Sequence, residues 1–199
     1  MTRITPPELP IDPQGSTHVA DQIVHIARLV HGGAADPSLT PAQWTALRYF
    51  ACANRFSRTP SAFSQFHATT RGTASQTVKS LIALGLLERH ANEADGRSAL
   101  IEVTPEGRRK LATDPLADLS RCIDALEAPR RAMFIEALSD IAEALAQMRA
   151  TPTFGNCGDC GHCDTSSGSK AYCRCTQSML THSDMDALCI DFAPVAQPR

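Results

Sequence analysis

The sequence predicts an α+β fold that is mostly α-helical and ends in a small tail held together by metal. Apolar residues recur every three or four positions over several stretches, which is typical of amphipathic helices. Two short apolar runs around one polar segment predict a single β-hairpin. Six of the eight cysteines follow residue 156, where large apolar residues are few. Because a chain of 199 residues can bury one good core, this last segment needs another source of order.

The chain divides into three predicted parts. Residues 1–15 are rich in proline and are expected to form a flexible arm. Residues 16–149 contain the helical patterns and the hairpin, and residues 150–199 form the cysteine-rich tail. No apolar stretch reaches membrane-spanning length and the N-terminus has no export signal, so we expect a cytoplasmic protein without membrane contact.

Capping residues predict where the helices begin. The first helical pattern begins at Ser16 or Thr17 and ends at the glycines 32–33. Thr-Pro pairs at 40–41, 59–60 and 104–105 each supply an N-cap and a proline at the first helical position. The second pair predicts a short helix over residues 61–67, with Phe63 and Phe66 pointing inward.

The next segments of the sequence predict a helix-turn-helix followed by a wing. A helix is expected to begin at Thr73 and to stop at Gly85, so that a short helix, a turn and a longer helix follow one another. Residues 86–89 and 99–103 flank the polar segment Asn92–Gly96 and predict a hairpin with an Asp-Gly turn.

The second half of this domain is expected to form a dimer. From Leu116 to Met148, apolar residues form a stripe at helical spacing, interrupted at Pro129. The stripe is longer than one small winged domain can cover. We therefore expect helical dimerisation elements that pack on a second copy of the chain.

The charge distribution favours a nucleic-acid partner. The net charge is only −2, but residues 37–87 contain no Asp or Glu. The same stretch supplies five positive charges, which predict one basic face that meets phosphates. They are Arg48, Arg55, Arg58, Arg71 and Lys79.

The tail cysteines predict a metal centre. Their density suits zinc or an iron–sulfur cluster, whereas disulfides would be expected in an exported protein. Cys52 and Cys122 lie alone in helical segments and are expected to be small buried apolar groups in a reducing compartment.

The domain resembles the MarR family of bacterial winged helix-turn-helix regulators over about residues 16–149. The resemblance rests on five segments in the family's order: LTPAQWTAL at 39–47, TASQTVKSL at 73–81, LGLLER at 84–89, DGRS at 95–98 and VTPEG at 103–107. It implies a homodimer on a pseudo-palindromic operator in double-stranded DNA, with residues 73–83 as the recognition helix. The implied DNA contacts are Thr73, Ser75, Gln76, Thr77 and Lys79, with Arg71 beside them and Arg97 at the wing tip. Hydroxyls, an amide and a lysine without a nearby carboxylate suit phosphates and base edges.

The tail is similar to the short four-cysteine modules of high-potential-type [4Fe–4S] proteins. That similarity implies Cys157, Cys160, Cys173 and Cys189 as ligands, with Phe192 as the shielding aromatic residue. Cys163 and Cys175 are spare or substitute ligands. Zinc is the alternative, because Cys157–Gly161 is similar to a zinc knuckle and Cys173 with Cys175 could complete four thiolates. His162 and His182 are further possible zinc ligands.

These observations predict a transcription regulator, a repressor, whose iron–sulfur tail senses redox state, oxygen or iron. No catalytic constellation is present, so we do not expect an enzyme. One alternative is a regulator with a structural zinc site. A second alternative is an electron-transfer protein that uses the winged domain to bind other proteins, and a salt-sensitive affinity for duplex DNA would exclude it.

Overall fold

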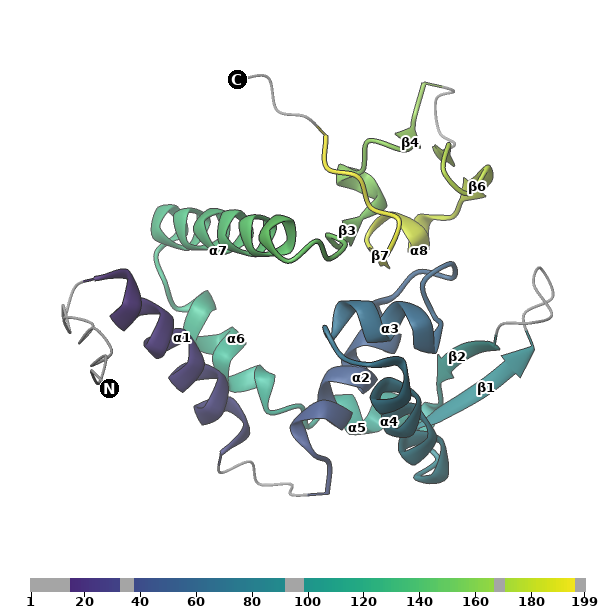
Figure 1. The fold of residues 1–199 in the computed structure, drawn as a ribbon, viewed down its shortest axis with the longest axis horizontal. Helices are drawn as coiled ribbons and strands as arrows, with labels where there is room; N and C mark the ends of the chain where they lie inside the picture. Colours follow the sequence, from purple (N-terminus) through teal and green to yellow (C-terminus); the bar gives the residue numbers. More distant parts are fainter. Residues whose placement is uncertain (1–14, 33–37, 92–98, 167–170, 196–199) are drawn as a thin grey trace, which may run out of the picture.

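The computed structural model describes residues 15–32, 38–91, 99–166 and 171–195. Residues 1–14 of the predicted arm and the wing tip at 92–98 lie outside these residues. Nine elements make up the first part of the chain (Figure 1). They are α1 Ser16–His31, α2 Pro41–Cys52, α3 Pro60–Phe66, α4 Arg71–Ala83, β1 Leu87–Ala91, β2 Ala99–Val103, α5 Pro105–Leu111, α6 Leu116–Asp124 and α7 Ala128–Met148.

The predicted caps are confirmed at three helices. Thr40, Thr59 and Thr104 each accept a hydrogen bond from a backbone N–H three residues later, and a proline follows each of them. The start of α4 was predicted wrongly at Thr73. The helix begins at Arg71, because the side chain of Thr70 accepts a hydrogen bond from the Thr73 N–H and thereby caps a turn that contains Gly72.

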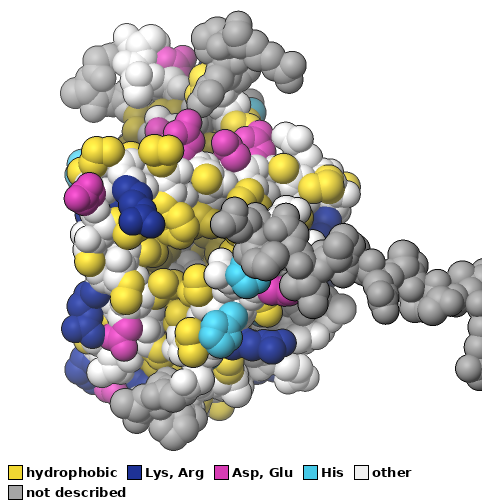
Figure 2. All heavy atoms as spheres, turned by 90° about the vertical axis from the view of Figure 1, so that its left-hand side faces the viewer, with side chains coloured by type: hydrophobic (Ala, Val, Ile, Leu, Met, Phe, Trp, Pro, Cys, Tyr) yellow, Lys and Arg dark blue, Asp and Glu magenta, His cyan; other side chains and the backbone are white. Residues whose placement is uncertain are grey.

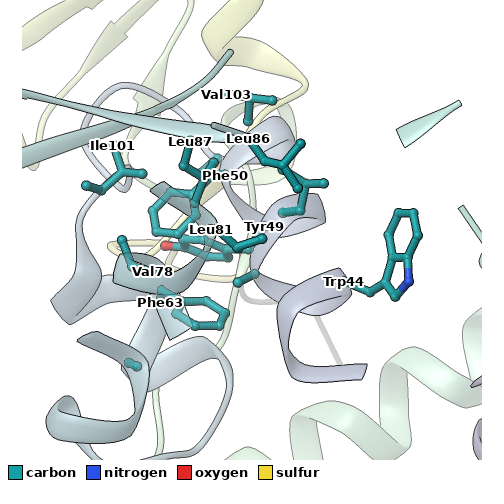
Figure 3. Close-up of a cluster of buried hydrophobic side chains, with 14 of the residues drawn as sticks. Trp44, Tyr49, Phe50, Phe63, Val78, Leu81, Leu86, Leu87, Ile101 and Val103 are labelled. Atoms are coloured by element: carbon teal, nitrogen blue, oxygen red, sulfur yellow. The ribbon is translucent and has the colours of Figure 1, made fainter. Parts of the chain in front are cut away.

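The core of the winged domain lies between α2, α3, α4 and the hairpin (Figure 3). Trp44, Tyr49 and Phe50 of α2 are almost fully buried, and the rings of Tyr49, Phe50 and Phe63 contact one another. Phe66 differs from the prediction, since 38% of it is exposed. Its ring lies 5.0 Å from those of Tyr49 and Phe154, so it covers the core from outside.

The hairpin pairs β1 with β2 in antiparallel register, with Leu87 opposite Val103. Gly85 ends α4 with a φ of 70°, a conformation that favours glycine. Its carbonyl accepts a hydrogen bond from the Thr104 hydroxyl, which joins the end of α4 to the start of α5.

Among the helices that the structure describes, α1, α6 and α7 have no buried residue in the single chain. Figure 2 shows hydrophobic side chains across the side of the molecule where these helices lie. The exposed apolar residues are Val19, Ile23, Val24, Ile26 and Leu29 of α1 and Met133, Phe134, Ile135, Leu138, Ile141, Leu145 and Met148 of α7. The expectation that Cys52 and Cys122 are buried is wrong, because both thiols are exposed.

The tail forms short elements that pack against the winged domain. They are β3 Gly155–Asn156, the 3₁₀ helix η1 Cys157–Asp159, β4 Cys163–Asp164, β5 Ala171–Cys173, β6 Ser178–Leu180, α8 His182–Met185 and β7 Leu188–Cys189. β4, β5 and β6 form one sheet, and β3 pairs with β7. Phe154, Leu188 and Ile190 contact the main core. Within the described ranges, no helix has both the length and the apolar character that crossing a membrane requires.

Candidate nucleic-acid interface and candidate metal centre

The outer face of α4 presents most of the predicted DNA contacts. Arg71, Thr73, Gln76 and Lys79 are exposed, while Ser75 and Thr77 are partly buried. Ala74, Val78 and Leu81 hold the opposite face of the helix in the core. The Thr77 hydroxyl donates its hydrogen to the Thr73 carbonyl. Its oxygen can then only accept a hydrogen bond from a binding partner. α4 itself contains no carboxylate.

The predicted basic face is wrong for three of its five members. Arg48 lies 2.8 Å from a carboxylate oxygen of Asp114, Arg55 lies 3.6 Å from one of Asp184, and Arg58 lies 3.5 Å from one of Glu102. These acids come from distant parts of the sequence, which the absence of acids between residues 37 and 87 could not reveal. Arg71 and Lys79, both on α4, remain as the charges available to phosphates. Arg97 lies outside the described residues.

The four predicted metal ligands are the most buried tail cysteines. Cys157, Cys160, Cys173 and Cys189 are 3–7% exposed, whereas Cys163 is half-buried and Cys175 is exposed. All eight cysteines are free thiols. Cys157, Cys173 and Cys189 share one apolar cluster with Leu180, against which Phe56 and Met185 pack. Phe192, the predicted shielding ring, packs against Gly155, where a Cβ atom would lie 2.6 Å from it.

Hydrogen-bond donors point at the sulfur atoms of the same four cysteines. The Cys160 sulfur lies 3.5 Å from the His162 N–H and 3.4 Å from the Ala193 N–H, and the Cys173 sulfur lies 3.5 Å from the Thr176 N–H. The Cys157 sulfur lies 3.9 Å from the Asn54 side-chain nitrogen. Donors to Cys189 are Asn54, Ser57 and the Asp191 backbone. Donors that favour the thiolate form suit metal ligands. Neither Cys163 nor Cys175 has such a donor among the described residues.

Burial favours the neutral thiol form of Cys157 and Cys189 in the absence of metal. Burial, and to a smaller extent the neighbouring Cys189, raise the pKa of Cys157 from 9.0 to about 12, while the hydrogen bond from Asn54 opposes the shift. Burial is also the main cause that raises the pKa of Cys189. Several thiolates this close repel one another, so a cation is needed before they can deprotonate together.

The spacing of the sulfur atoms bears on the type of metal. Four thiolates around one zinc ion lie about 3.8 Å apart, given Zn–S bonds of about 2.3 Å. No three cysteine sulfurs in the described part of the chain lie within 4.8 Å of one another. His182 is exposed at the start of α8, and His162 is partly buried. The sulfur atoms of the described cysteines are therefore not arranged as a preformed mononuclear zinc site.

The connection between α2 and α3 also contributes to this site, which was not predicted from the sequence. Ala53 forms a parallel bridge with Leu188, and the Asn54 N–H donates to the Leu188 carbonyl at 2.8 Å. The Ile190 N–H donates to the Ser57 hydroxyl at 2.9 Å. Arg55 binds the Met179 carbonyl as well as Asp184. Residues 53–58, in the first third of the chain, have no sequence pattern that would link them to cysteines about 100 residues away.

The winged domain matches known proteins. Residues 38–98 match the model of the MarR family. Over this stretch, which is less than half of the chain, the sequence is therefore similar to MarR-family domains. No curated protein matches the chain.

Several solved structures are similar in fold to about two thirds of this chain. The PcaV transcriptional regulator from Streptomyces coelicolor, in complex with its natural ligand, has a TM-score of 0.54 and 20% identity, over 69% of this chain and 99% of that one. A MarR transcriptional regulator from Methanosarcina mazei Go1 has a TM-score of 0.55 and 15% identity, over 66% and 96%. The Staphylococcus aureus MepR–DNA complex has a TM-score of 0.55 and 16% identity, over 66% and 98%.

Proposed function

We propose that the protein is a MarR-type transcription regulator, a repressor, that binds a pseudo-palindromic operator as a homodimer. The observation that carries the proposal is the outer face of α4, which combines Arg71, Thr73, Gln76 and Lys79 with no carboxylate in the helix. Such a face can donate to phosphates and to base edges in a major groove. MepR, a structural neighbour, was solved bound to DNA.

The exposed apolar faces of α1 and α7 support the homodimer. α7 has 21 residues and none is buried in the single chain. Apolar patches of this extent mark protein interfaces. A second copy is the occupant that suits a MarR-type regulator, because two recognition helices must reach half-sites about 34–36 Å apart.

We propose further that the tail binds a [4Fe–4S] cluster through Cys157, Cys160, Cys173 and Cys189. These four are the buried cysteines with donors at their sulfur atoms, and the sulfur atoms of the described cysteines are not arranged as a preformed mononuclear zinc site. When bound, the cluster supplies a centre that responds to redox state, oxygen or iron. The chain's own residues would hold the thiolates, exclude water with Phe56 and Met185, and join the centre to the winged domain.

The test is selection from randomised duplexes with the anaerobically purified full chain. We expect two-fold symmetric sequences, an affinity that falls steeply with salt, and a change in affinity when air destroys the cluster. Recovery of no preferred sequence and a salt-insensitive affinity would favour the electron-transfer alternative. Colourless protein with one tightly bound zinc ion after iron-replete anaerobic expression would replace the cluster with the structural zinc site.

A further inference from the structure

Asn54 connects the cysteine centre to the helix-turn-helix through one planar amide group. Its side chain is almost fully buried, with 1% exposed. The oxygen accepts hydrogen bonds from the Phe56 N–H at 3.1 Å and the Ser57 N–H at 3.0 Å. The nitrogen of the same amide lies 3.9 Å from the Cys157 sulfur. One end of the group therefore orders the α2–α3 connection, and the other end faces a metal ligand.

The α2–α3 connection is in turn joined to the elements that position the DNA-binding face. The Tyr49 hydroxyl of α2 donates to the Ser57 carbonyl at 2.8 Å. The Ile101 N–H of β2 donates to the Arg58 carbonyl at 2.8 Å, and Arg58 Nε donates to the Ala53 carbonyl at 3.0 Å. A shift of residues 53–58 would thus act directly on α2 and on β2 of the hairpin.

The strength of the Asn54–Cys157 contact depends on the charge of the sulfur. A neutral thiol is a weak acceptor, and 3.9 Å is long even for a bond to sulfur. A metal-bound thiolate carries negative charge, and hydrogen bonds to charged acceptors are shorter and about twice as strong. Since the amide is rigid, a closer approach to the thiolate also moves the oxygen that holds Phe56 and Ser57.

We infer that Asn54 is the positioning residue that transmits metal binding at the tail cysteines to the helix-turn-helix. Its amide donates to the Cys157 thiolate, and the α2–α3 connection and β2 adjust to that bond. The inference rests on the proposed function only in requiring a metal-bound thiolate at Cys157 and DNA binding by the domain.

The experiment compares the full chain with three variants. Asn54→Asp keeps an acceptor for Phe56 and Ser57 but removes the donor, and Asn54→Ala removes both without adding charge. Arg55→Ala is the matched control, because it loses contacts to Met179 and Asp184 in the tail without touching a sulfur atom. For each chain, DNA affinity is measured in the loaded and metal-free states, together with the midpoint potential and amide exchange of residues 53–58.

In the parent chain, loading should slow amide exchange at Phe56 and Ser57. Asn54→Asp should remove this difference and bring the ratio of loaded to metal-free DNA affinity at least about tenfold closer to 1. Both Asn54 variants should lower the midpoint potential, since a donor to a ligand sulfur is lost. Arg55→Ala should keep the parent potential and ratio.

Two results would overturn the inference, and they are distinguishable. If both Asn54 variants keep the parent's ratio, potential and exchange pattern, Asn54 does not transmit loading, although the proposed function stands. If the parent chain itself loads no metal, or binds DNA equally with and without it, the proposed function fails first and the inference fails with it.

Discussion

Single residues on α4 are expected to contribute to DNA binding without contributing to the fold. Lys79 is exposed and has no partner among the described residues, so Lys79→Ala should leave the thermal unfolding midpoint unchanged. Its loss should reduce the salt slope of binding by about 1. Arg97→Ala should cost about 1–3 kcal/mol on the cognate site if the wing arginine contacts bases. Fluorescence anisotropy at several salt concentrations measures both effects.

The control for this pair is Arg121→Ala, which removes one positive charge from α6, where Arg121 pairs with Asp118. It should change DNA affinity little. Parent-like binding by both Lys79→Ala and Arg97→Ala would mean that α4 and the wing do not face DNA as proposed.

The tail cysteines are expected to fall into two classes. Serine at position 157, 160, 173 or 189 should abolish the visible absorption of the anaerobic protein, because each buried thiolate holds part of the cluster. Cys163→Ser and Cys175→Ser should retain it, since neither sulfur has a hydrogen-bond donor in the described structure. Iron and sulfide analysis should give about four of each per chain for the coloured proteins. Colour lost in Cys163→Ser but kept in Cys160→Ser would require a different ligand set.

Loading of the centre is expected to depend on pH. Burial raises the pKa of Cys157 to about 12 and also raises that of Cys189, so both are neutral thiols in the metal-free chain near pH 7. Metal binding must then release about one proton per coordinated thiolate. Affinity should therefore rise with pH and fall in acid. Titration in weakly buffered solution measures the released protons, and loading without proton release would contradict this assignment.

At the scale of elements, local signals predicted the helix-turn-helix well. Thr-Pro pairs fixed the starts of α2, α3 and α5, because capping and proline geometry depend only on neighbouring residues. The docking of the tail could not be predicted. It depends on contacts such as that between Asn54 and Cys157, which are 103 residues apart and follow no periodic pattern. The ion pairs of Arg48, Arg55 and Arg58 escaped prediction for the same reason.

The α7 face provides the test of the dimer. Leu138 and Leu145 are 38% and 45% exposed in the single chain, and a second copy would cover them. Leu138→Asp should abolish dimerisation because it places an unpaired carboxylate in an apolar interface, at a cost of several kcal/mol. DNA affinity should fall with it. Sedimentation measures the association, and Glu143→Asp, on the same helix, is a control with unchanged helix charge. A monomeric parent that binds a palindrome tightly would exclude the dimer.

At the scale of the whole molecule, the two parts of the chain derive their order from different sources. The winged domain buries Trp44, Tyr49, Phe50 and Phe63, a core that holds together without metal. The tail buries mainly cysteines, with Leu180 as the large apolar residue in their cluster. It remains attached to the domain through Phe154, Leu188 and Ile190.

Removal of the metal is therefore expected to loosen one part and spare the other. Residues 155–192 should become sensitive to protease when air or a chelator removes the centre, because the thiolates no longer hold short elements of two to four residues together. Residues 16–149 should stay folded, and their thermal unfolding should shift only by the loss of the contacts that Leu188 and Ile190 make with the core. Limited proteolysis with mass spectrometry, run on loaded and metal-free samples, follows both parts at once. Equal protection of the tail in both states would show that apolar packing orders it, and the centre would then have to act on DNA affinity without reordering the tail.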